Sequence, residues 1–147
     1  MQKRALVVLA LAFGLSAAAQ EAAAPVPPLK SVADARKLAD KAMGLFQKEK
    51  LAEGYDVLKP YWPLPPIEID SIANTTATQW PIVEQRYGAS IGTEFLTEQP
   101  LGNSFVRLIY LQKFERHAIR WVFIFYKPND RWIVNSFSFD DSISAMF

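Results

Sequence analysis

The sequence predicts an α+β fold in which N-terminal helices pack on a curved antiparallel sheet of about four strands. Two observations predict it. Apolar residues recur at helical spacing as far as about residue 87, and from residue 89 onward the period changes to two. Helices and strands that are segregated along the chain in this way are typical of α+β domains. A chain of 147 residues without cysteine suits one domain that is held together by its core alone.

The first 19 residues have the pattern of a signal peptide. Lys3 and Arg4 precede an uncharged run rich in Leu, Val and Ala that ends in three alanines. Cleavage after Ala19 would send the protein to the periplasm or out of the cell and leave no stable membrane anchor. The alternative is an uncleaved anchor, but a membrane-spanning helix needs about 20 strongly apolar residues, and this run is shorter.

Residues 20–30 are predicted to form a flexible linker of Ala and Pro, followed by one domain over residues 31–147. The whole chain has 16 basic and 15 acidic residues, and two of the basic ones leave with the signal peptide. A nucleic-acid-binding protein normally has a strong basic excess, so no nucleic-acid partner is expected.

Three helical segments are expected before the sheet. Ser31 and Asp34 form a capping box pattern ahead of an apolar stripe that runs to residue 46. A short helix over residues 51–58 should stop at Pro60, which cannot continue it. The stripe over residues 69–87 contains Pro81, where we expect a kink or a break, and Gly88 should end it.

The strands are expected over residues 93–98, 104–114, 118–127 and 131–139, joined by short turns. Residues 140–147 form either a capped helical turn or a loose tail. Asp140 and Asp141 at its start suit helix capping better than a catalytic carboxylate pair.

Residues 121–126 are all apolar or aromatic, so both faces of this strand need cover from water. We expect one face of the sheet to pack on the helices through Ile109, Trp121, Phe123 and Phe125. The opposite face should present an interface for a second copy or another protein, formed by Tyr110, Arg120, Val122, Ile124 and Tyr126. Arg107, Arg116 and Arg120 add a local basic character to the sheet.

The helix-then-meander order and the residues of 114–121, 125–128 and 135–140, with Trp132, resemble the NTF2-like (cystatin-like) superfamily. The likeness is to small exported bacterial proteins of unknown function. It implies a bent sheet wrapped around helices as a cone. The region between the second and third helices departs from the family pattern, because it is rich in proline where the family often has a strand. The superfamily includes enzymes, binding proteins and assembly modules, so the fold alone does not imply a function.

Three functions remain open. The leading interpretation is a non-enzymatic exported domain that forms a homodimer or binds a protein partner. The second is a binder of a small apolar ligand, in a pocket inside the cone lined by Trp80, His117 and Trp121. The third is a proton-transfer enzyme or hydrolase that uses His117, which is a weak catalytic candidate because it is a single titratable group. Neither a metal nor a cofactor is expected, since the chain has one His, no Cys, and no nucleotide-binding or calcium-loop motif.

Overall fold

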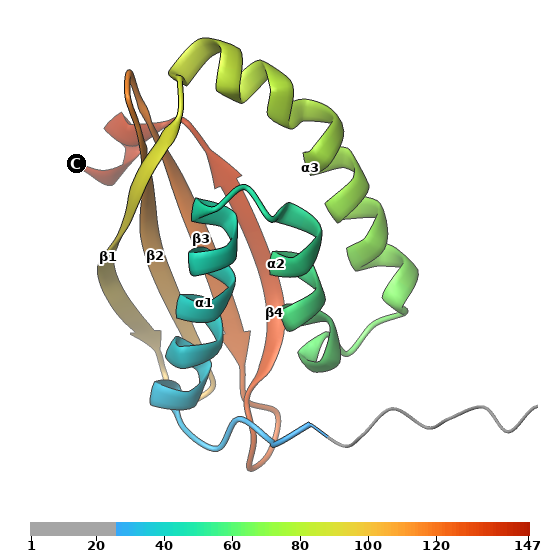
Figure 1. The fold of residues 1–147 in the computed structure, drawn as a ribbon. Coiled ribbons are helices and arrows are strands. Elements are labelled where there is room, and N and C mark those ends of the chain that lie inside the picture. Colours follow the sequence, from blue (N-terminus) through green and yellow to red (C-terminus); the bar gives the residue numbers. More distant parts are fainter. Residues whose placement is uncertain (1–25) are drawn as a thin grey trace, which may run out of the picture.

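The computed structural model describes residues 26–147, in which three helices precede a four-stranded sheet (Figure 1). The predicted signal peptide, residues 1–19, and residues 20–25 of the predicted linker lie outside the described residues. The elements follow in the order α1 (Val32–Gln47), α2 (Leu51–Leu58), the 3-10 turn η1 (Lys59–Tyr61), α3 (Pro66–Tyr87), β1 (Ser90–Leu101), β2 (Phe105–Phe114), β3 (Ala118–Tyr126), β4 (Ile133–Asp140) and the 3-10 turn η2 (Ile143–Met146).

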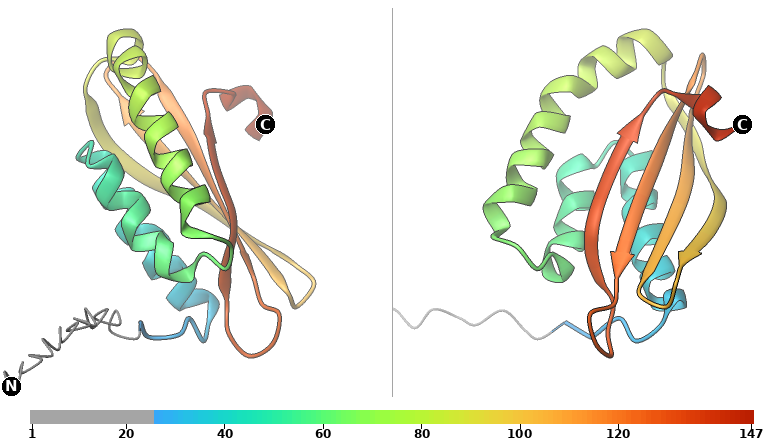
Figure 2. Two further views of the ribbon diagram at one scale, coloured as in Figure 1. Left: turned by 90° about the vertical axis from the view of Figure 1, so that its right-hand side faces the viewer. Right: turned by 180° about the vertical axis from the view of Figure 1, so that it is seen from behind.

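The sheet confirms the predicted α+β class. Each strand pairs antiparallel with the next along the chain, which gives the order β1-β2-β3-β4. The sheet is not closed, so β1 and β4 are its edges and β3 is an inner strand. Figure 2 shows α1 and α2 on one side of the sheet and the C-terminal turn η2 on the other.

Helix α1 begins where the sequence predicts, because Ser31 and Asp34 form a capping box. The Asp34 N–H donates to Ser31 Oγ at 3.1 Å, and the Ser31 N–H donates to Asp34 Oδ2 at 3.1 Å. These bonds satisfy backbone donors that have no partner at the start of a helix. The buried stripe of α1 consists of Ala35, Leu38, Ala39, Ala42, Met43 and Phe46.

Helix α3 runs from Pro66 to Tyr87 without a break at Pro81. An internal proline removes one hydrogen bond and presses its ring against the preceding turn, and a helix can accommodate both by bending. Figure 1 shows α3 curved along its length. Gly88 follows the helix with φ of 84°, a left-handed conformation that glycine adopts without strain. None of the helices within residues 26–147 has both the length and the apolar character needed to span a membrane.

The core lies between the sheet and the helices and is centred on Trp121. This side chain is fully buried, and its ring stacks on Phe46 of α1 with centroids 4.3 Å apart and planes 9° apart. The fully buried Gln112 accepts a hydrogen bond from Trp121 Nε1, and its own Nε2 donates to the Phe46 carbonyl and to Ser90 Oγ, all at 3.0 Å. The helix–sheet interface around Trp121 is therefore filled by side chains, and the polar groups of Trp121 and Gln112 are paired there.

The strand register places Tyr110 and Ile109 on the opposite faces from those expected. Tyr110 lies directly across from Trp121, and Ile109 lies across from Val122. Residues directly opposite in an antiparallel pair share a face, so Tyr110 faces the helices, where its OH donates to Asp40 Oδ1 at 2.7 Å. The two expected placements are wrong for one reason: a shift of one residue exchanges the faces of a strand.

The segment before α1 is attached to the domain. Leu29 is 5% exposed and forms a β-bridge with Trp132, whose N–H donates to the Leu29 carbonyl at 2.8 Å. The OH of Tyr61 donates to the Pro27 carbonyl at 3.0 Å. The folded part therefore begins a few residues before the expected boundary at residue 31.

Candidate functional site

The face of the sheet that points away from α1, which we call the outer face, carries most of the predicted interface. On β3, Arg120, Val122, Ile124 and Tyr126 alternate with buried residues that face the helices, and all four are half-buried. Tyr110 is not part of this face. The residues of β2 in register with these four are Leu111, Ile109, Arg107 and Phe105.

The C-terminal turn η2 covers one end of the outer face. Ala145 and Met146 line a hollow there together with residues of all four strands, and Figure 2 shows the turn on the side of the sheet away from α1 and α2. Asp140 precedes the turn, and its Oδ1 accepts a hydrogen bond from the Ser142 N–H at 2.8 Å. Of the two expectations for residues 140–147, the structure has a short helical turn, but no side chain forms a capping hydrogen bond to it.

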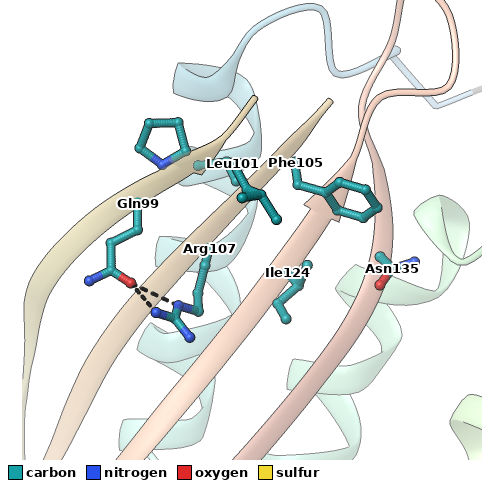
Figure 3. A pocket seen from close by; sticks show the side chains of 8 residues that line it. Gln99, Leu101, Phe105, Arg107, Ile124 and Asn135 are labelled. Atoms are coloured by element: carbon teal, nitrogen blue, oxygen red, sulfur yellow. Dashed lines mark hydrogen bonds between the residues drawn. The ribbon is translucent and has the colours of Figure 1, made fainter. Parts of the chain in front are cut away.

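A second hollow, of about 440 Å³, opens on the outer face beside the turn that joins β1 to β2 (Figure 3). Leu101, Phe105 and Ile124 give it apolar walls, and Asn135 of β4 adds an amide on the far side. Leu101 is 73% exposed, so this end of the face is open to solvent. The residues that line the hollow are Gln99, Pro100, Leu101, Phe105, Val106, Arg107, Ile124 and Asn135.

Arg107 lies at one side of this hollow and has no carboxylate partner among residues 26–147. Its Nε donates to Gln99 Oε1 at 2.8 Å and one terminal NH2 group donates to the same oxygen, as Figure 3 shows. An amide oxygen accepts these bonds but does not neutralise the charge. The other outer-face arginine, Arg120, is paired with Asp140 at 2.7 Å. The hollow therefore combines apolar walls with one uncompensated positive charge.

The two tryptophans predicted to line a pocket inside the cone are packed into the core. Trp80 and Trp121 both contact the ring of Phe139, with centroids 6.2 and 4.8 Å from it, so a phenylalanine ring lies between them. Their exposed fractions are 4% and 0%. His117, the third predicted residue, lies after β2 with its ring 4.6 Å from that of Tyr87. Other aromatic rings therefore lie between these three side chains, which do not meet around a common pocket.

The titratable groups around His117 are engaged in local hydrogen bonds. Tyr87 OH donates to Asp141 Oδ2 at 2.5 Å. This bond raises the pKa of Tyr87 and lowers the pKa of Asp141. Asp140 pairs with Arg120 and accepts a hydrogen bond from the Ser142 N–H, so the two aspartates have different partners and do not act as a carboxylate pair. Nowhere in residues 26–147 do three His, Asp or Glu side chains gather closely enough to hold a metal ion.

The sequence reasoning missed the contribution of Leu101 and Phe105 to the outer face. Both flank the turn that joins β1 to β2 and face each other across the register, whereas the sequence predicts a first strand that ends at residue 98. The sequence contains an indication that Phe105 belongs to this face, because Phe105 lies two residues before Arg107 in β2. Alternation along a strand puts residues two apart on one face.

The resemblance to NTF2-like proteins stays a prediction. No protein-family model, curated protein or solved structure matches the chain. A functional proposal must therefore be based on the geometry of this chain.

Proposed function

We propose that this chain is a non-enzymatic, exported interaction domain of the NTF2-like type that self-associates through its outer face. The observation that carries the proposal is the row of Val122, Ile124 and Tyr126, which are only half-buried although β3 is an inner strand. The turn η2 covers one end of the face and leaves the other end open. A face that mixes Tyr, Arg and aliphatic side chains is the composition that protein interfaces favour.

A stable dimer requires that the open end of the outer face is also buried, because the other apolar side chains of this face contribute too little free energy by themselves. Full burial of a large apolar side chain contributes about 1.5–3 kcal/mol, so a half-buried one has on the order of 1 kcal/mol left to gain. In a two-fold dimer every contact occurs twice, so Val122, Ile124 and Tyr126 would together contribute on the order of 6 kcal/mol. Association costs at least about 4 kcal/mol. Leu101 and Phe105 must therefore also be covered for a stable dimer.

The test is the mass in solution of the chain without its predicted signal peptide, residues 20–147. Analytical ultracentrifugation at micromolar concentration should give a dimer. Ile124→Lys should give a monomer, because it places a second positive charge directly opposite Arg107 in each copy, in the apolar centre of the interface. Circular dichroism should show unchanged helix content in the variant, since Ile124 faces away from the helices.

Ile82→Lys is the matched control. Ile82 is 58% exposed on α3, so the substitution introduces the same charge on a surface outside the proposed interface and should leave the dimer intact. A native chain that sediments as a monomer at these concentrations overturns the proposal. So does a dimer that Ile124→Lys leaves unchanged.

A further inference from the structure

We infer that the dimer binds a small amphipathic carboxylate at Arg107, with the apolar part of the ligand in the hollow beside the β1–β2 turn. The inference rests on the proposed function, because the need for the anion follows from covering the outer face with a second copy. It adds a ligand class to that face and assigns a role to its one uncompensated charge.

The first step is that a second copy cannot cover Ile124 without covering Arg107. The two residues lie directly opposite each other on β2 and β3, and side chains in such pairs are within about 5.5 Å of each other. Arg107 is exposed in the single chain, where water solvates its charge. Removing an unpaired guanidinium from water opposes association unless a counter-charge enters with it.

The second step is that the outer face does not supply this counter-charge. Within residues 26–147, the side-chain carboxylates that the strands place on this face are in ion pairs: Asp140 pairs with Arg120, and Glu94 pairs with Lys113 at 3.6 Å. A symmetric second copy brings the same paired groups. The anion therefore comes from a third component.

The third step concerns the shape and chemistry of that component. The Arg107 guanidinium has five N–H donors and uses two of them on Gln99. The remaining donors suit a carboxylate, which arginine binds in a planar, two-bond geometry. Leu101, Phe105 and Ile124 line the adjoining hollow (Figure 3). Its volume of 440 Å³ lies within the range of about 300–1,000 Å³ that is typical of small-molecule sites. A ligand that satisfies both features has one carboxylate and an apolar chain.

The experiment measures the dimer dissociation constant of residues 20–147 by ultracentrifugation in the presence of octanoate, octan-1-ol or acetate. A ligand that binds the dimer better than the monomer strengthens the dimer by mass action. Octanoate should lower the dissociation constant at least about tenfold. Octan-1-ol lacks the charge and acetate lacks the chain, so each should have a smaller effect than octanoate.

Arg107→Gln separates this inference from a general effect of fatty acids. The variant should dimerise at least as tightly as the native chain without any ligand, because no charge is buried, and octanoate should no longer strengthen it. Arg131→Gln removes an exposed arginine that does not line the hollow, and this control should keep the full octanoate response.

The outcomes distinguish the two proposals. A chain that is monomeric at micromolar concentration without octanoate overturns the proposed function, and one that also stays monomeric with octanoate overturns the ligand inference as well. A dimer that octanoate does not strengthen overturns the ligand inference and leaves the dimer in place. An Arg107→Gln dimer that responds to octanoate as the native dimer does also overturns the ligand inference.

Discussion

Replacing Gly54 by alanine should destabilise the domain, although alanine is the better helix former. Gly54 is buried in α2. A Cβ at this position would overlap Phe46 Cε1 and lie 2.6 Å from Phe46 Cδ1. The ring cannot move away at low cost, because Phe46 is fully buried and its other face stacks on Trp121 with centroids 4.3 Å apart.

Two opposing terms set the magnitude. Replacing glycine by alanine inside a helix contributes about 0.5–1 kcal/mol. Inserting a methyl group into a well-packed core costs about 1–3 kcal/mol, and an immobile aromatic neighbour puts Gly54 at the upper end of this range. The free energy of unfolding should therefore fall by about 2 kcal/mol in Gly54→Ala. Gly44 in α1 provides the contrast, because a Cβ there meets nothing within 4 Å. Gly44→Ala should raise the free energy of unfolding by about 0.5–1 kcal/mol.

Urea unfolding followed by circular dichroism measures both changes at one protein concentration. The midpoint should move down for Gly54→Ala and up for Gly44→Ala, while the dependence on urea concentration stays the same. A Gly54→Ala chain as stable as the native one would refute the reasoning, since the Phe46 ring would then be free to move. A Gly44→Ala chain that is less stable than the native one would show that this substitution changes more than helix propensity, and it would refute this part of the reasoning.

Two further predictions concern the buried polar groups. Gln112→Leu should lower the free energy of unfolding by about 1–3 kcal/mol, because it leaves Trp121 Nε1 buried without a partner, whereas the Phe46 carbonyl keeps the bond that it accepts from the Glu49 N–H; an unchanged urea midpoint would contradict this. Burial raises the pKa of Tyr55 from 10.0 to about 12. The folded chain therefore holds this proton more tightly than the unfolded chain, and stability should fall as the pH rises from about 10 to about 12. Tyr55→Phe should remove on the order of 2–3 kcal/mol of that fall, and equal pH dependence of the native and variant urea midpoints would argue against it.

The features that the sequence predicted correctly are those decided by near neighbours along the chain. The capping box needs only Ser31 and Asp34, three residues apart. The two faces of β3 follow from strict alternation between buried and half-buried residues from Ile119 to Tyr126. The ends of α2 and α3 follow from Pro60 and Gly88. Each of these features depends only on residues within one turn of a helix or within one strand.

The faces of β2 were harder to predict, because residues 108–111 are four large side chains without alternation. Two signals in this strand conflict. Arg107 and Lys113 have odd positions and mark the outer face, which is the correct assignment. Gln112 has an even position and is polar, yet it is fully buried, because its amide joins the Trp121 indole to the backbone of α1. A buried glutamine of this kind cannot be recognised without knowing its three-dimensional partners.

What covers the outer face is also decided by contacts between distant parts of the chain. The turn η2 reaches β3 only after the chain has passed through β4, and it covers the end of the face near Arg120. The half-buried state of Val122 is therefore partly explained by the chain itself. Ile124 lies further from this cover and beside the hollow with Arg107. The structure thus narrows the predicted interface from a whole face of the sheet to the end beside the β1–β2 turn. Apolar side chains and the uncompensated charge of Arg107 occur together there, so a partner at this end must cover the apolar side chains and neutralise the charge.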